Sequence, residues 1–145
     1  MNAPLLTHRV AVIAYIIRDG RFLLLKRRTP PLLWAPPGGR LLPAENPSAG
    51  LLREVKEETA LDVEVAAPVD VWFGDWEGAP LLSIDYLVRI KGGKLTLSSE
   101  HSDFAWLSLA ELEKGKPVAL HPEIGFTLQD FQKAARLHKL LKETL

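Results

Sequence analysis

The sequence has no cysteine and only one methionine among its 145 residues. The absence of cysteine excludes disulfide bonds and thiol-based catalysis. No window reaches the ~18 consecutive apolar residues of a membrane-spanning helix. Residues 1–8 also lack the long apolar core and the cleavage pattern of a secretory signal. We therefore expect a cytoplasmic protein that does not enter a membrane.

The sequence also lacks an excess of charge of either sign. Its 18 basic and 18 acidic residues cancel, and the pI is near 6.9. No overall positive field is therefore present to hold a long nucleic acid. The composition, 47% hydrophobic and 25% charged, is that of a folded globular protein. A phosphate-bearing small molecule would need local positive charge or a metal ion to bind.

The stretch from residue 38 to residue 61 combines a glycine turn, a loop and an acidic helix. Asn46 is a favourable N-cap, and Pro47 suits the first helical position because no N–H bond is lost there. At about 100° per residue, the carboxylates Glu54, Glu57 and Glu58 share one face of the helix. The opposite, apolar face is formed by Leu51, Leu52, Val55 and Thr59.

The acidic face is unusual, because like charges four residues apart destabilise a helix by about 0.2–0.5 kcal/mol per pair. Arg53 is expected only to flank this face, and Lys56 lies away from it. Clustered carboxylates are the ligands that Mg²⁺ prefers, together with water and substrate phosphates. At this point two interpretations stay open, a solvated helix face and a magnesium site.

Residues 39–61 follow the pattern G-x5-E-x7-R-E-V-x-E-E-x-A-L. This pattern resembles the Nudix box, the signature of the Nudix (MutT) hydrolases, in which a glycine stands in place of Ala60. Leu42 and Ala44 also depart from the glutamate and the glycine that are common in the family. A left-handed residue after a helix is easy for glycine and costs alanine about 1 kcal/mol. We expect the turn at Ala60 to be kept under mild strain.

The resemblance implies the α/β (α+β) Nudix fold, in which a mixed β-sheet is sandwiched between helices in an α-β-α arrangement. It covers roughly residues 8–114. A single domain over residues 1–145 is expected, with the box at 39–61 and a final helix at about 128–143. The apolar side of that helix is expected to pack on the sheet or on a second subunit of a homodimer.

The resemblance further implies a Mg²⁺-dependent pyrophosphohydrolase, for which Mn²⁺ can substitute. Its substrate would be a nucleoside diphosphate linked to another group: a nucleoside triphosphate, a nucleotide sugar or a dinucleotide polyphosphate. The metal would neutralise phosphate oxygens and activate a water molecule. The proton acceptor is Glu54 or Glu100, with His101 and Asp103 as secondary candidates in the loop of Glu100. The metal ligands would be Glu54, Glu57 and Glu58.

Neighbouring positions have both structural and binding interpretations. In the family the pair Glu45 and Arg53 fixes the loop against the helix. The basic residues 26–28 either end a strand or contact phosphate, and the tryptophan before the glycine turn either packs in the core or covers substrate. Backbone N–H groups of the glycine turn are expected to bind phosphate. The candidate substrate contacts are Arg27, Gly38, Gly39 and Trp34.

Alternating and β-branched segments predict seven strands, at 10–17, 22–27, 61–65, 69–73, 81–90, 95–97 and 104–107. Pro68 separates two of them, and residues 74–80 form a turn or loop. Asp85 is expected on the polar side of its strand. A capping box at Ser108 predicts a short helix to about residue 114. Four aromatic residues either belong to the core or stack on a nucleobase: Trp72, Phe73, Trp76 and Tyr86.

The same fold is compatible with two other functions. A nucleotide-sensing module without catalysis would be expected to lose a glutamate of the box, and none is lost. An isomerase of isopentenyl-type diphosphates would need a cysteine, which the chain lacks. The sequence does not distinguish between nucleotides, nucleotide sugars and dinucleotides as substrate, and it leaves the oligomeric state open.

Overall fold

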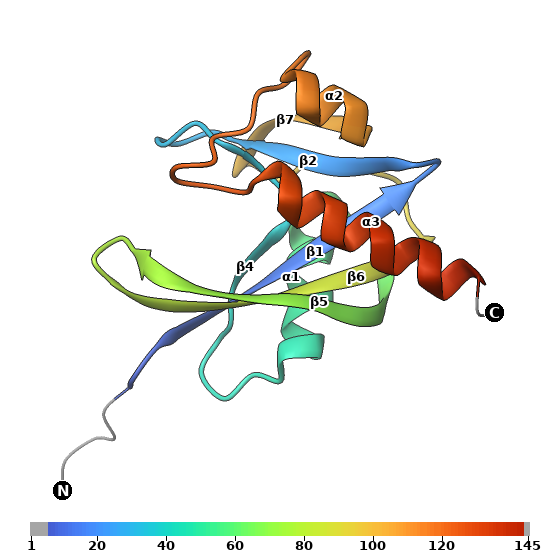
Figure 1. The fold of residues 1–145 in the computed structure, drawn as a ribbon. Helices are drawn as coiled ribbons and strands as arrows, with labels where there is room; N and C mark the ends of the chain where they lie inside the picture. Colours follow the sequence, from blue (N-terminus) through green and yellow to red (C-terminus); the bar gives the residue numbers. More distant parts are fainter. Residues whose placement is uncertain (1–5, 144–145) are drawn as a thin grey trace, which may run out of the picture.

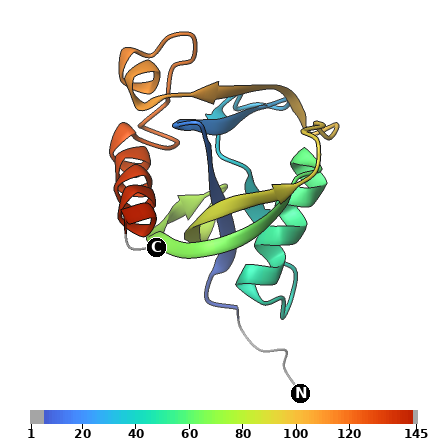
Figure 2. The same ribbon diagram turned by 90° about the vertical axis from the view of Figure 1, so that its right-hand side faces the viewer.

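The computed structural model describes residues 6–143. Residues 1–5, which belong to the segment expected to lack a secretory signal, lie outside the described residues. A seven-stranded mixed sheet has the order β3-β2-β1-β6-β5, with β4 paired to β1 and β7 paired to β2. Figures 1 and 2 show α1 and α3 on opposite sides of this sheet, which confirms the α-β-α arrangement. The elements are β1 (Arg9–Arg18), β2 (Arg21–Arg27), β3 (Trp34–Ala35), β4 (Gly38–Arg40), α1 (Pro47–Thr59), β5 (Asp62–Trp76), β6 (Ala79–Gly92), β7 (His101–Leu107), α2 (Leu109–Lys114) and α3 (Leu128–Glu143).

Strand β1 is the central element, because it contacts three other strands. It runs parallel to β6 over most of its length, and its end forms a hairpin with β2 through the Asp19-Gly20 turn. Its middle pairs with β4, where Val12 lies opposite Gly39 and Ile13 opposite Gly38. A Cβ atom on Gly38 would collide with the carbonyl oxygen of Val12, so this close approach requires glycine. The glycine turn is thus held rigidly on the sheet.

Alternation along β1 divides the core into two clusters, one on each face of the sheet. Val12, Ala14 and Ile16 face α1, whose Leu51 and Val55 are fully buried against them. The other cluster lies under α2 and α3 and is dominated by aromatic contacts, with the ring of Phe131 5.6 Å from Tyr15 and 5.1 Å from Phe22. Of the two positions expected for the final helix, the structure therefore has it on the sheet.

Strand β5 corrects the prediction of two strands separated by Pro68. One strand runs unbroken from Asp62 to Trp76, with irregular register on both sides of the proline. β5 is the last strand in the order of the sheet, and a proline without an N–H donor is tolerated at such an edge or at a bulge. The turn predicted within residues 74–80 is present but shorter than expected, because Glu77 and Gly78 alone form it, both with positive φ.

Two further expectations were wrong. Residues 95–97 do not form a strand: Thr96 N–H donates to Thr59 O (2.9 Å) and Ser98 N–H to Glu58 O (3.2 Å). The last carbonyls of a helix lack partners within the helix, so this segment pairs with them instead. Asp85 was expected on a polar side, yet it is 5% exposed and accepts a hydrogen bond from the Ser83 hydroxyl.

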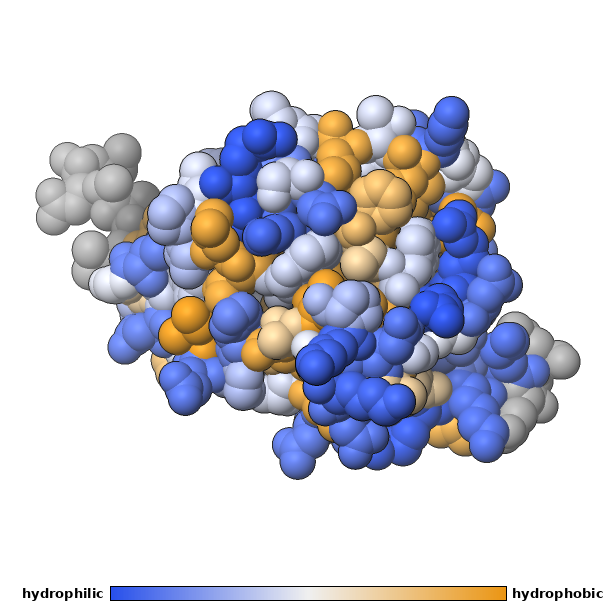
Figure 3. Space-filling view, turned by 90° about the horizontal axis from the view of Figure 1, so that it is seen from above, coloured by the Kyte–Doolittle hydropathy of each residue, from blue (hydrophilic) through white to orange (hydrophobic). Residues whose placement is uncertain are grey.

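No helix among residues 6–143 combines the length and the apolar character needed to cross a bilayer. On the face seen in Figure 3, hydrophobic residues form separate areas among hydrophilic ones. Neither observation tests the expected homodimer, which stays a prediction.

Candidate active site

The position of α1 follows from its two caps and its buried face. Asn46 Oδ1 accepts hydrogen bonds from the N–H groups of the second and third helical residues, as predicted for an N-cap. At the other end, Ala60 has φ 61° and donates its N–H to Lys56 O, which confirms the left-handed turn on a non-glycine residue. Leu52, expected on the apolar face, is 39% exposed. The buried residues therefore anchor α1 along one line and leave its carboxylates facing β4.

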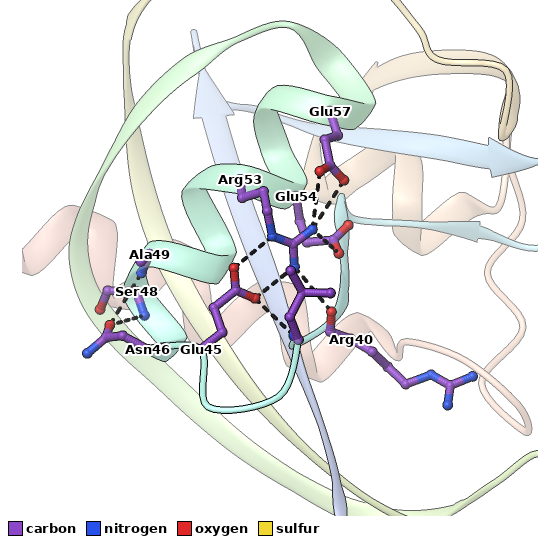
Figure 4. Close-up of polar contacts among 9 residues, drawn as sticks. Arg40, Glu45, Asn46, Ser48, Ala49, Arg53, Glu54 and Glu57 are labelled. Carbon is purple, nitrogen blue, oxygen red and sulfur yellow. Dashed lines mark hydrogen bonds and ion pairs between the residues drawn. The ribbon is translucent and has the colours of Figure 1, made fainter.

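Arg53 lies among the carboxylates and does not merely flank them (Figure 4). Its Nε and Nη2 donate to the two oxygens of Glu45, at 2.7 and 2.8 Å, in a bidentate pair. Its Nη1 also reaches Glu54 Oε1 at 3.0 Å and Glu57 Oε2 at 3.2 Å. The hydrogen bonds from Arg53 hold the pKa of Glu45 down to about 2, with help from the Leu42 N–H. Arg53 and its three partners Glu45, Glu54 and Glu57 are called the Arg53 cluster below.

Glu58 is in a different environment on the same face of the helix. Its side chain is 6% exposed, and its Oε1 accepts a hydrogen bond from Gly38 N–H at 2.7 Å. Burial raises the pKa of Glu58 to about 8, and the nearby charges of Glu54 and Glu100 act in the same direction. The described residues place no arginine or lysine in an ion pair with it. In this structure Gly38 N–H donates to Glu58, and phosphate binding by the glycine turn stays a prediction.

Glu54 lies between these two environments and depends on Gly39. A Cβ atom on Gly39 would lie 2.5 Å from the Glu54 carboxylate, so a larger residue would force that carboxylate to move. Burial raises the pKa of Glu54, and the hydrogen bond from Arg53 partly opposes this. Glu54 is thus partly withdrawn from water while one of its oxygens is bound to arginine.

Glu100 and His101 reach the site from the other edge of the sheet. The segment before them pairs with the end of α1, and Arg28 fixes it by donating to the backbone oxygens of Ser99 (2.9 Å) and Glu100 (3.1 Å). Strand β7 pairs His101 with Arg27 of β2. Ligand atoms of Glu58, Glu100 and His101 all lie within 4.8 Å of one another. These three residues are called the Glu58 site below.

Some of the predicted substrate contacts lie near the site and one lies in the core. Gly38 and Gly39 lie directly beside Glu58 and Glu54. Arg27 lies close enough for its charge to lower the pKa of His101, after the larger effect of burial and against the opposing effect of Glu100. Trp34 instead packs against the cluster under α3, in agreement with the packing interpretation.

Of the residues in this site, His101 was the hardest to predict from the sequence. It was named only as a secondary candidate, because a single histidine in a polar loop carries little signal. Its position depends on the register between β2 and β7, which no local pattern reveals. The adjacent Glu100 was the one signal available.

The donor set fits a divalent cation. Several carboxylates and one imidazole converge beside a buried acid that has no arginine or lysine ion pair among residues 6–143, and buried charges normally need a partner. His101 Nδ1 is also buried without a hydrogen-bond partner among the described residues. Oxygen donors with one nitrogen donor suit metals that prefer five or six ligands.

Comparison with known proteins agrees with this geometry. The NUDIX domain family matches residues 7–128. A MutT-like protein of Streptomyces ambofaciens is 33% identical over 107 residues, covering 74% of this chain and 68% of that protein. The asymmetrical bis(5'-nucleosyl)-tetraphosphatase of Caenorhabditis elegans is 30% identical over 115 residues, covering 76% of this chain and 81% of that protein. The crystal structure of the MutT protein from Methanosarcina mazei Go1 superimposes with a TM-score of 0.75 and 26% identity, covering 91% of this chain and 96% of that chain.

The names of further relatives differ in substrate. An ADP-ribose pyrophosphatase of Methanocaldococcus jannaschii is 31% identical over 72% of this chain, which spans 64% of that protein. A putative 8-oxo-dGTP diphosphatase of Bacillus subtilis is 27% identical over 87% of this chain and 80% of that protein.

Proposed function

The chain belongs to the NUDIX family of hydrolases acting on phosphoanhydride bonds, and on that premise we propose that it is a divalent-metal-dependent pyrophosphohydrolase of a nucleoside diphosphate linked to a second group. The observation that carries this proposal is the convergence of Glu58 with Glu100 and His101 beside the glycine turn. Glu57 and Glu54 stand next to this site on the same helix face. The proposed metal ligands are Glu54, Glu57 and Glu58. Glu100 is a further proposed ligand, because its carboxylate lies within 4.8 Å of the ligand atoms of Glu58 and His101.

The metal is proposed to be Mg²⁺ or Mn²⁺. When bound, it supplies positive charge against the phosphate oxygens and increases the acidity of a coordinated water molecule. Arg53 holds Glu45, Glu54 and Glu57 in fixed positions, so the carboxylates do not have to be ordered when substrate arrives. Arg27 is proposed to contact a phosphate group.

For the proton acceptor, the surroundings favour Glu54 over Glu100. Burial raises the pKa of Glu54, and a base whose pKa lies closer to neutrality accepts a proton more effectively in the transition state. Glu100 instead faces Glu58 and His101 as a ligand would. Glu54→Gln is expected to lower kcat by about 10²–10⁴-fold even when the metal concentration is raised to saturation. Glu100→Gln is expected to weaken metal binding, and the opposite pattern would reverse the two assignments.

The substrate class is best addressed by a panel drawn from the relatives. It would contain 8-oxo-dGTP, ADP-ribose and a bis(5'-nucleosyl) tetraphosphate, together with the nucleotide sugars expected from the sequence, each with Mg²⁺ and with Mn²⁺. Chromatography would identify the mononucleotide product, and ¹⁸O-labelled water would identify the phosphorus atom attacked.

The control variants share the same chemical change. Glu57→Gln alters the proposed site, whereas Glu113→Gln alters an exposed glutamate of α2. We expect turnover of at least one compound by the wild type and by Glu113→Gln, and its loss in Glu57→Gln. Tight binding of one compound without turnover of any would contradict the enzyme and favour a nucleotide-sensing module.

A further inference from the structure

His101 is unusual among the polar residues of the site because neither of its ring nitrogens has a normal hydrogen bond among the described residues. Nδ1 is buried and has no partner. Nε2 lies 3.5 Å from Glu58 Oε2, beyond the 2.7–3.2 Å range typical of a hydrogen bond. A histidine with a purely structural role would be expected to use one of these nitrogens, because buried polar groups are normally paired.

The long distance between His101 and Glu58 fits two ligands of one ion. Adjacent ligands of an octahedral ion with bonds of about 2.1 Å lie roughly 3 Å apart. The 3.5 Å separation therefore needs only a small adjustment to accommodate a shared cation. Glu100 completes the group within the same 4.8 Å limit.

The three side chains come from elements that are fixed independently. Glu58 is held by Gly38 N–H and by its place on α1. The backbone of Glu100 is held by Arg28 N–H, and His101 belongs to the ladder between β7 and β2. The imidazole is 12% exposed, so it is not free to turn away into solvent. A preformed site with a nitrogen donor selects metals by ligand type as well as by size.

We propose that His101 is a nitrogen ligand of the cation at the Glu58 site, and that the site therefore takes a first-row transition-metal dication such as Mn²⁺ or Co²⁺ in preference to Mg²⁺. Mg²⁺ prefers oxygen ligands only and keeps several water molecules, whereas affinity for imidazole-containing sites rises from Mn²⁺ to Co²⁺. This inference rests on the proposed function for the presence of a metal, but it concerns the identity of that metal.

The direct test is pulsed electron paramagnetic resonance of Mn²⁺ bound to the full-length protein. A directly coordinated histidine nitrogen gives a ¹⁴N coupling that changes when the histidines are labelled with ¹⁵N. We expect this coupling in the wild type and in His121→Gln, which alters an exposed histidine elsewhere. We expect it to be absent in His101→Gln. Its absence from the wild type, or its persistence in His101→Gln, would overturn the proposal.

Titration calorimetry with each metal alone gives a second measurement. His101→Gln is expected to weaken binding of Mn²⁺ and Co²⁺ by about 10–100-fold, while changing Mg²⁺ binding by less than about 3-fold. Equal losses for all three metals would assign His101 to positioning Glu58 and would overturn ligation. Because the wild-type spectrum needs no variant, a folding defect in His101→Gln does not remove the test.

The two proposals fail in different ways. A nitrogen coupling without turnover of any compound in the panel would support His101 as a metal ligand and would contradict the proposed hydrolase activity. Turnover of a compound without a nitrogen coupling would support the hydrolase activity and would contradict metal ligation by His101.

Discussion

The Arg53 cluster and the Glu58 site both include carboxylates from one face of α1, yet they balance negative charge in opposite ways. Arg53 places a permanent cation against Glu45, Glu54 and Glu57, and it lowers the pKa of Glu45 to about 2. Glu58 is more deeply buried, and among residues 6–143 it accepts a hydrogen bond from one backbone N–H, that of Gly38. Its pKa is raised to about 8. The carboxylates of the Arg53 cluster are paired with an arginine, whereas Glu58 has no arginine or lysine partner in the part of the chain that the structure describes.

This difference indicates which carboxylates depend on a metal. An ion pair within the protein persists when metal is removed, because both partners are covalently part of the chain. A buried carboxylate without such a partner must be protonated or must bind a cation from outside. The comparison therefore predicts that chelation affects the Glu58 site most and the Arg53 cluster least.

The largest effect is expected for Glu58→Gln. An amide keeps the shape and can still accept from Gly38 N–H, but it cannot supply a charged oxygen to the metal. Steady-state assays on the substrate found in the panel should show a loss of activity of at least about 10²-fold. Glu113→Gln is the matched control. Activity within about 3-fold of wild type in Glu58→Gln would place the metal elsewhere.

The second prediction concerns stability against pH in chelated protein. Because the folded pKa of Glu58 is about 8 and its unfolded value is about 4.5, the unfolded state loses the proton first as pH rises. Stability should therefore be highest below pH 4.5 for this group and should fall up to pH 8. The loss has an upper limit of about 5 kcal/mol, since one pKa unit corresponds to about 1.4 kcal/mol.

Urea unfolding in EDTA at several pH values would measure this loss. Glu58→Gln should remove the fall between pH 4.5 and 8 and should be more stable than wild type at pH 8. Equal slopes in the two proteins would contradict the raised pKa.

The third prediction probes the other half of the comparison. Arg53→Lys keeps the charge but loses the bidentate pair with Glu45, so it should lower the free energy of unfolding by about 1–3 kcal/mol. Arg40→Lys makes the same change at an exposed pair with Glu77, and it should matter by less than about 0.5 kcal/mol. Urea unfolding would measure both. Similar effects of the two substitutions would mean that the Arg53 cluster contributes no more than a surface pair.

The smallest effect is expected at the end of α1. Ala60 has φ 61°, which glycine adopts without strain, so Ala60→Gly should raise the free energy of unfolding by about 0.5–1 kcal/mol. The same change at the exposed helical Ala49 should lower it by a similar amount. Thermal unfolding would show the sign of each. A decrease for Ala60→Gly would mean that the turn is not strained.

The sequence allowed prediction of features that depend on nearby residues. The Asn46 cap, the turn at Ala60, the capping box at Ser108 and the box spacing are all local, and the structure contains each. Features set by distant pairing were missed. The segment 95–98 pairs with carbonyls of α1, and His101 reaches Glu58 only through the β2–β7 register. Arg53 was misplaced because helix geometry gives directions but does not show how far a long side chain reaches.

The most direct test of the account is the effect of Mn²⁺ on thermal unfolding at pH 8, comparing wild type, Glu58→Gln and Glu113→Gln. A ligand at 100 times its Kd stabilises the folded state by about 2.7 kcal/mol, which raises Tm by several degrees. We predict that Mn²⁺ raises the Tm of wild type and of Glu113→Gln, and that it leaves the Tm of Glu58→Gln unchanged. An equal rise in Glu58→Gln would show that the buried carboxylate does not bind the metal, and would contradict the central claim.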